Sequence, residues 1–215
     1  MVVAAGASVW IARGSRRRAT EAISVVLALV IVAGWIGEQV ADVVEGIWAV
    51  KYTLPLQLTD AVSIVAVVAL LRPRPLLVEL TYFWALTASL QATLTPDLAR
   101  TFPSVFYFSY FAYHVGAVVA ACLLVYGQRR YPRPGAAWRV FAITLAFAAI
   151  AGAADLITGG NYMYLRHKPE RASLLDVMGA WPWYILETGV LALAMLLALQ
   201  ALTEAGRARS RPAPR

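Results

Sequence analysis

The sequence predicts an all-α fold, a polytopic transmembrane bundle of six or seven helices, on three observations. Of the 215 residues, 60% are apolar and 14% are charged, whereas an ordinary soluble domain has about 25% charged residues. The apolar residues come in blocks close to the roughly 20 residues that a helix needs to cross a bilayer. The basic residues are also spread unevenly over the connections between these blocks.

Six apolar blocks are predicted to span the membrane. Most prolines lie near their ends, where a helix tolerates proline best. A further apolar block, residues 1–12, is too short to cross alone because 12 residues of helix rise only about 18 Å. The helix count is therefore six without this block and seven with it. The six predicted spans are residues 19–41, 54–71, 76–94, 104–126, 138–157 and 182–202.

The chain is divided into three predicted regions around these spans. Residues 1–18 form a short apolar segment with a basic connection, residues 19–202 form the transmembrane domain, and residues 203–215 form a disordered tail. Of the 19 Lys and Arg residues, 14 lie on one set of alternating connections and 5 on the other. Since basic residues favour the cytoplasmic side, the sequence predicts a multi-pass protein of the cell membrane with a cytoplasmic C-terminus.

Charge and cysteine content limit the possible partners. The net charge of +7 follows the membrane topology, and no basic patch interleaved with aromatic residues indicates a nucleic acid partner. Because Cys122 is the single cysteine, an intramolecular disulfide and a multi-cysteine metal site are excluded. We expect no cofactor and no metal.

His114 lies in the middle of the span 104–126. A charged side chain at such a depth costs roughly 2.5–3.5 kcal/mol, so an ionisable residue there usually faces a partner or a cavity. Polar residues of other spans fall in the same outer half of the membrane, which predicts a polar cavity with His114 at its floor. These residues are Glu38, Gln57, Thr59, Asp60, Gln91, Asp155 and Glu187.

These residue types suggest acyl-transfer chemistry. A threonine hydroxyl such as that of Thr59 attacks only when a base takes its proton, and His114 is the one imidazole within a span. Asp60, Asp155 or Glu187 would orient the imidazole, and Gln57 or Asn161 would donate a hydrogen bond to the oxyanion. Both central residues also have structural interpretations. Membrane threonines usually bond to a carbonyl of their own helix, and a buried histidine often links two helices by a hydrogen bond.

The connection 158–181 is predicted to lie outside the cytoplasm. It is too polar to span and rich in tyrosine, methionine and tryptophan, and loops of more than about 12–15 residues are often lids or binding elements. Ser173 and Asp176 have the spacing of a capping box for a short amphipathic helix. His167 lies between Arg166 and Lys168 and is expected to be solvated.

Two sequence runs resemble a known family. LPLQLTDA at residues 54–61 and NYMYLRHKPERASLLDVMGAWPWYIL at residues 161–186, with the embedded His114, resemble the YwaF family of bacterial integral membrane proteins. The resemblance covers about residues 19–202. It implies a relation to a mammalian transmembrane acyltransferase of ether phospholipids, and more distantly to the androgen-induced fatty-ester hydrolases.

For the catalytic pair, the resemblance implies an intramembrane threonine nucleophile, matched by Thr59, and a histidine on another helix, matched by His114. Relatives often carry cysteine where this chain has Thr59. The leading hypothesis is an intramembrane lipid ester hydrolase or acyltransferase that acts on membrane lipids or an amphiphilic acyl substrate. The alternatives are a non-enzymatic binder or transporter of a lipid or small solute, and a structural subunit. The oligomeric state and enzymatic activity itself stay open.

Overall fold

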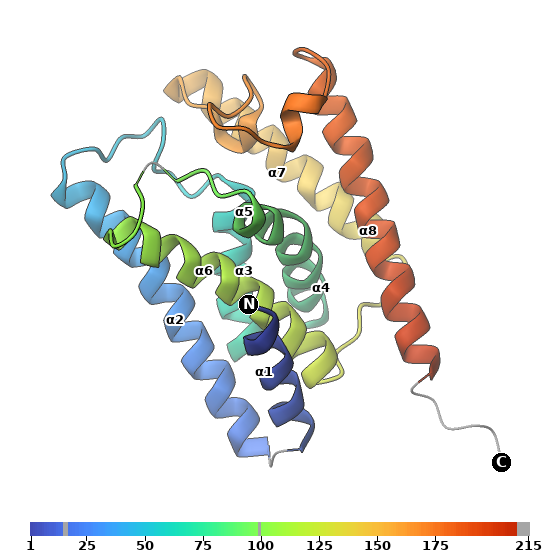
Figure 1. Ribbon diagram of the computed structural model, residues 1–215. Coiled ribbons are helices and arrows are strands. Elements are labelled where there is room, and N and C mark those ends of the chain that lie inside the picture. Colours follow the sequence, from blue (N-terminus) through green and yellow to red (C-terminus); the bar gives the residue numbers. More distant parts are fainter. Residues whose placement is uncertain (15–16, 99, 210–215) are drawn as a thin grey trace.

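The computed structural model describes residues 1–14, 17–98 and 100–209, and within them every regular element is helical. The prediction of an all-α bundle is thereby confirmed. Within these described ranges the chain forms seven helical rods, and two short 3-10 turns, η3 (Tyr162–Tyr164) and η4 (Leu174–Val177), lie between the last two (Figure 1). The rods are α1 (Val2–Gly14), α2 (Arg17–Val44), α3 (Leu58–Leu71), α4–η1–α5 (Pro75–Trp84, Ala85–Ser89, Leu90–Leu94), α6–η2 (Val105–Cys122, Leu123–Gly127), α7 (Ala136–Thr158) and α8 (Trp183–Arg209).

Four of the described helices are long and apolar enough to cross a membrane: Arg18–Val44, Val105–Gly127, Ala136–Thr158 and Trp183–Arg207. α1 and α3 are apolar but shorter. The 13 residues of α1 rise about 20 Å, less than the roughly 30 Å of a hydrocarbon core. α1 is therefore too short to cross a hydrocarbon core by itself, and it packs on α2 and on the α6–η2 rod.

Helix α3 begins four residues later than the predicted span. Pro55 disfavours a helical backbone at Leu54, and Gln57 precedes the helix with an extended backbone (φ −74°, ψ 146°). The backbone N–H of Gln57 donates to Asp60 Oδ2 at 3.2 Å. Residues 54–57, which were predicted to belong to the span, therefore form a non-helical entry segment.

Helix α8 ends later than the predicted boundary. It continues to Arg209, whereas residues 203–215 were expected to be disordered. The physical reason is composition, because alanine, glutamate and arginine favour helix and basic residues stabilise a helix C-terminus. Residues 210–215, which belong to the same prediction, lie outside the described residues.

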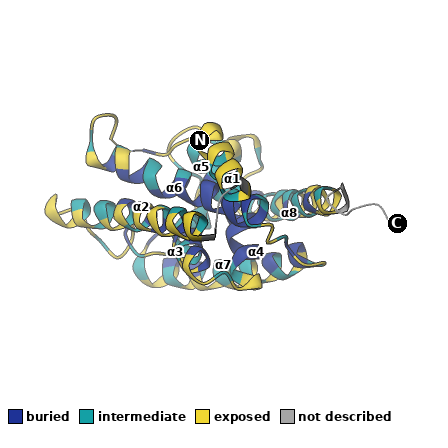
Figure 2. Cartoon of the chain, turned by 90° about the horizontal axis from the view of Figure 1, so that it is seen from below, coloured by how far each residue is buried: buried dark blue, intermediate teal, exposed yellow. Residues whose placement is uncertain are grey.

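Helix α6 is the centre of the bundle. It contacts α1, α2, α3 and the α4–η1–α5 rod, and 72% of its span is buried, against 6% for α8. Figure 2 shows the buried residues gathered on α4 and α6 and the exposed residues along the outer faces of α2 and α8. α7 and α8 pack against each other on one flank (Figure 1). Polar groups of α6 therefore meet neighbours on nearly every side.

The close contact of α2 with α6 depends on Gly34. A Cβ atom on this residue would lie 2.8 Å from Cβ of Ala112 and 3.0 Å from the carbonyl oxygen of Ser109. Small residues allow membrane helices to approach closely in this way. The backbone of α6 cannot move aside as a side chain could, so position 34 has no room for a methyl group.

We expect Gly34→Ala to lower the free energy of unfolding by about 1–3 kcal/mol through overpacking. Thermal unfolding in detergent, followed by circular dichroism, measures the change. Gly189→Ala on α8 is the matched control, since no described atom outside its own helix turn lies within 4 Å of the new methyl group. An equal effect of the two substitutions would contradict the close contact.

The two ends of the bundle differ in charge. One end of the bundle contains the connections from α3 to α4 and from the α6–η2 rod to α7, and we call it the arginine end. The opposite end carries residues 159–182, and we call it the loop end. At the arginine end, Glu79 of α4 is buried (1% exposed) and lies between two half-exposed arginines, Arg133 and Arg139. Glu79 Oε1 accepts from Arg133 Nε at 2.8 Å and from Arg139 Nη2 at 3.0 Å. The backbone N–H of Arg133 also donates to Oε1 at 3.0 Å. The Glu79 carboxylate thus links α4 to the segment that precedes α7.

Candidate functional site

The imidazole of His114 is held rigidly within α6. The side chain is 2% exposed, and Nδ1 lies 2.8 Å from the carbonyl oxygen of Tyr110. A carbonyl only accepts, so Nδ1 carries the proton and the neutral ring presents a lone pair at Nε2. The rings of Tyr110 and Tyr113 lie against the imidazole, with centroid distances of 4.0 Å and 4.2 Å. Nε2 has no hydrogen-bond partner among the described residues.

Thr59 lies in the first turn of α3, a helix that packs against α6. Its side chain is half-buried, and its hydroxyl has no hydrogen-bond partner within the described ranges. Its carbonyl oxygen accepts from Ser63 Oγ at 2.8 Å. No hydrogen bond joins Thr59 to His114 in the described part of the chain. The two residues therefore lie on contacting helices, and their pairing stays a prediction.

The carboxylate of Asp60 forms its hydrogen bonds with residues other than His114. Its Oδ1 accepts from Trp35 Nε1 at 3.1 Å, and its Oδ2 accepts from the backbone of Gln57 at 3.2 Å. A carboxylate in the first turn of a helix also interacts favourably with the helix dipole. Asp60 thus stabilises the start of α3 and links it to α2. The expectation that a carboxylate orients His114 is wrong, because the Tyr110 carbonyl occupies Nδ1.

A second carboxylate, that of Glu38 on α2, lies near Asp60. The carboxylate of Glu38 interacts with the hydroxyl of Tyr113, and both lie close enough to Asp60 to interact electrostatically. Tyr113 also contacts the His114 ring. Side chains of α2, α3 and α6 thus gather around Tyr113, with His114 next to it on α6, and the polar cavity expected above His114 stays a prediction.

Tyr162 connects this region to the loop end. Its hydroxyl donates to the carbonyl oxygen of Val50 at 2.6 Å and accepts from the N–H of Leu54 at 3.0 Å. Its backbone N–H donates to Asp155 Oδ1 at 2.7 Å. Burial raises the pKa of the Tyr162 phenol, so the hydroxyl remains a donor. Asp155 is 0% exposed, and its Oδ2 has no hydrogen-bond partner among the described residues. Asp155 therefore holds the loop and not the imidazole.

Gln57 fixes the next residue of the same loop. Its Oε1 accepts from the backbone N–H of Met163 at 2.8 Å. Met163 and Tyr164 both have left-handed backbones, with φ values of 54° and 56°. Such conformations cost of order 1–3 kcal/mol each for non-glycine residues and persist only where the surroundings enforce them. The loop is therefore held in a strained turn against the start of α3.

Asn161 and Glu187 form hydrogen bonds with the backbone of the loop between α7 and α8. Asn161 Nδ2 donates to the carbonyl oxygen of His167 at 2.8 Å, and Asn161 Oδ1 accepts from the N–H of Arg166 at 2.9 Å. Glu187 Oε2 accepts from the N–H of Gly179 at 3.0 Å. Neither side chain hydrogen-bonds to His114 or Thr59 in the described structure. The amide of Asn161 is thus already engaged, and the role at an oxyanion proposed for it has no support here.

The predicted capping box of the loop is confirmed. The N–H of Ser173 donates to Asp176 Oδ2 at 2.7 Å, and Ser173 Oγ accepts from the N–H of Leu175 at 3.2 Å. The capped element is the 3-10 turn η4. Lys168 Nζ donates to the carbonyl oxygen of Met178 at 2.8 Å and closes the loop on itself. The loop is thus an ordered element over the end of the bundle.

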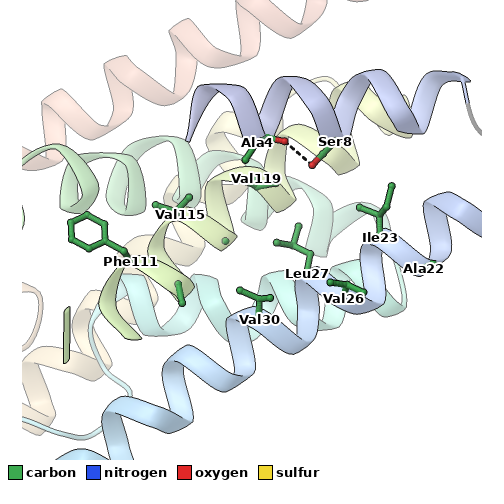
Figure 3. A pocket seen from close by; sticks show the side chains of 12 residues that line it. Ala4, Ser8, Ala22, Ile23, Val26, Leu27, Val30, Phe111, Val115 and Val119 are labelled. Atoms are coloured by element: carbon green, nitrogen blue, oxygen red, sulfur yellow. Dashed lines mark hydrogen bonds between the residues drawn. The ribbon is translucent and has the colours of Figure 1, made fainter. Parts of the chain in front are cut away.

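An apolar groove of about 490 Å³ lies between α1, α2 and α6 (Figure 3). On α6 it is lined by Phe111, Val115 and Val119. Since residues of a helix are about 100° apart, this face points away from the face of Tyr110 and His114. The groove is shaped for an apolar chain, and in this structure α6 separates it from the imidazole.

Two residues of the site were missed from the sequence: Trp35 and Tyr162. Both have aromatic rings that suit the membrane boundary, so their hydrogen bonds had no separate signal. Among the described residues, no group of three or more His, Cys, Asp or Glu side chains could hold a metal ion.

Comparison with known proteins places the chain in a family. The model of the TMEM164 family matches residues 1–200, which include every rod except the end of α8. The chain belongs to the TMEM164 family. No curated protein and no solved structure matches it. The match to TMEM164, together with the apolar helices, establishes a membrane protein with transmembrane helices. The narrower YwaF resemblance and the relation to ester hydrolases remain predictions.

Within this TMEM164-family chain, the matched region contains both Thr59 and His114. It also contains the loop between α7 and α8 and the network of Gln57, Asp60 and Asp155. The family match therefore applies to the part of the chain that holds the candidate site.

Proposed function

We propose that this protein is a membrane-embedded acyl-transfer enzyme, a lipid ester hydrolase or acyltransferase, with His114 as its base and Thr59 as its nucleophile. The observation that supports it best is the state of His114. Its ring is buried, clamped by two tyrosines and fixed in one tautomer, and its basic nitrogen Nε2 is not used by any described residue. A structural histidine would normally engage both nitrogens.

The proposed reaction proceeds in two proton transfers. Nε2 of His114 takes the proton of the Thr59 hydroxyl while Thr59 Oγ forms a bond to the ester carbonyl carbon. The imidazolium then returns the proton to the leaving alkoxide as the ester C–O bond breaks, which leaves the acyl group on Thr59. Water or an acceptor alcohol completes the cycle by attacking this new ester. Thr59 and His114 must approach each other for this step, since no hydrogen bond joins them in the structure.

The proposed substrate is a membrane lipid or another amphiphilic ester. Arg166 and Lys168 lie in the loop between α7 and α8 and offer positive charge to a lipid headgroup, whereas Arg171 is paired with Asp97. The distribution of basic residues supports a cytoplasmic arginine end and C-terminus. The loop end then faces outward, and the substrate is taken from the outer leaflet.

A hydroxyl-directed fluorophosphonate tests the proposal on the purified protein. We expect labelling of the wild type and of Thr59→Ser, which keeps a hydroxyl, and loss of labelling in Thr59→Val, which has the same shape without it. Mass spectrometry of the labelled peptide should place the modification on residue 59. Equal labelling of the wild type and Thr59→Val would overturn the assignment of the nucleophile.

The apolar groove favours a second candidate, a non-enzymatic binder of a lipid or apolar solute. Its lining by α1, α2 and α6 suits an acyl chain and requires no catalytic residue. This function predicts saturable binding of a fluorescent fatty acyl probe that persists in Thr59→Val and forms no product. Ester turnover that depends on Thr59 would exclude it as the main activity.

A further inference from the structure

Ser89 is a buried hydroxyl without a partner. It is the last residue of η1 and is 0% exposed, and its Oγ has no hydrogen-bond partner among the described residues. Other hydroxyls of the same rod bond to a carbonyl one turn earlier. Thr81 Oγ1 donates to Leu77 at 2.8 Å, and Thr87 Oγ1 donates to Phe83 at 2.7 Å. Ser89 is therefore an exception that requires an explanation, as buried polar groups nearly always have a partner.

The local helix type distinguishes this position. Ala85–Ser89 forms a π-helical turn, in which the N–H of Leu90 donates to the carbonyl oxygen of Ala85, five residues earlier. A π turn inside an α-helix inserts a residue and leaves a carbonyl without its usual amide donor, and such turns are frequent at functional sites. The region around Ser89 thus has more hydrogen-bonding capacity than an α-helix would leave.

Ser89 and His114 lie at the same level of one interface. The hydroxyl of Tyr110 on α6 donates to the carbonyl oxygen of Ala92 on α5 at 2.9 Å. α4–η1–α5 and α6 run in opposite directions, so one turn towards the arginine end leads from Ala92 to Ser89 and from Tyr110 to His114. His114 is only about 40° around the helix from Tyr110, and α6 packs directly on η1.

Two polar atoms at this level of the bundle have no hydrogen-bond partner among the described residues. Ser89 Oγ is sealed without a partner, and Nε2 of His114 has none among the described residues. They form no direct hydrogen bond with each other, and one bridging molecule would satisfy both. A buried water makes two to four hydrogen bonds with otherwise unsatisfied groups.

We propose that Ser89 Oγ and His114 Nε2 bind one internal water molecule at the π turn. The water donates a hydrogen bond to Nε2 and accepts one from the Ser89 hydroxyl. A carbonyl released by the π turn is the acceptor for its second proton. Ser89 is thus a positioning residue that acts on the imidazole through the water.

The chemical role of this water rests on the proposed function. After Thr59 has been acylated, Nε2 of His114 takes a proton from the water while the water oxygen bonds to the acyl carbonyl carbon. The bond from that carbon to Thr59 Oγ then breaks, and Thr59 Oγ receives the proton from His114. The product is a free fatty acid, so the water favours hydrolysis over transfer to an alcohol.

Nitrogen NMR tests the water site independently of any activity. The chain contains two histidines, His114 and His167, so ¹⁵N-histidine labelling of the full chain gives a simple spectrum, and His167→Gln assigns it. We expect the Nε2 resonance of His114 to show an accepted hydrogen bond in the wild type. In Ser89→Ala it should move to higher frequency, towards that of a free acceptor, and Thr81→Val, the buried hydroxyl control on the same rod, should leave it unchanged. A wild-type Nε2 without a hydrogen bond, or an unchanged Nε2 in Ser89→Ala, would overturn the site.

Activity measurements separate this inference from the proposed function. In Ser89→Ala we expect a loss of about 10²-fold in fatty acid release and accumulation of acylated Thr59 in intact mass spectra. If the NMR shift responds to Ser89 and the wild type forms no acyl intermediate, the proposed function fails and the water site stands. If turnover depends on Thr59 and neither NMR nor deacylation responds to Ser89, the water site fails and the function stands.

Discussion

Replacing His114 with alanine is expected to reduce ester turnover by about 10²–10⁴-fold, the usual contribution of a positioned general base. The imidazole is the only one within the predicted spans, and its Nδ1–H bond to Tyr110 leaves Nε2 as the free base. The loss should appear in kcat and in the rate of fluorophosphonate labelling, because Thr59 would keep its proton. Release of fatty acid from a short-chain ester in detergent micelles measures it.

His167→Gln provides the control for this substitution. It removes the other histidine, which is exposed in the loop and bonded to Asn161, so turnover should stay within about twofold of the wild type. Thermal unfolding of both variants by circular dichroism verifies that each is folded. A folded His114→Ala protein with wild-type turnover would show that His114 is a structural link between helices.

Glu79→Ala is expected to lower the free energy of unfolding by about 3 kcal/mol, near the lower end for a broken buried ion pair. The substitution leaves Arg133 and Arg139 without their shared carboxylate and removes the fixed contact between α4 and the start of α7. The lower end applies because both arginines are half-exposed and water can solvate them. Thermal unfolding in detergent micelles measures the effect.

Two further variants show whether Glu79 stabilises the bundle through its charge or through its shape. Glu79→Gln keeps the shape and removes the charge, so its stability should lie between those of the wild type and Glu79→Ala. Glu204→Ala removes an exposed carboxylate near the same end, bonded to Gln200 of its own helix, and should change stability little. If Glu79→Ala unfolds no earlier than Glu204→Ala, the two arginines do not stabilise the bundle through Glu79.

Several features of the fold could be predicted because they are local in the sequence. Six rods fall on the six predicted apolar blocks, and the Ser173 capping box forms from residues three apart. The errors are also local in origin. Pro55 delays the start of α3, and the helix-forming residues after Leu202 extend α8 beyond the predicted boundary.

The candidate site could be predicted less well, because hydrogen-bond partners depend on which helix faces meet. A carboxylate was expected at His114, yet a carbonyl of its own helix takes that place. Asp60 bonds to Trp35 of α2, a pairing 25 residues apart that no periodicity indicates. Tyr162 connects Asp155 to the entry of α3 through three hydrogen bonds that only the folded loop creates.

The sequence by itself determined that this protein is a helical membrane bundle with one embedded histidine, because span length, hydropathy and charge are properties of successive residues. Tertiary structure decided the surroundings of that histidine. The rotation of α6 against its neighbours brings the hydroxyl of Tyr110 to the carbonyl oxygen of Ala92 on α5. The same packing directs Tyr113 to Glu38 and separates the apolar groove from the imidazole. Such rotations result from the packing of whole helices, which a pattern along one helix does not specify.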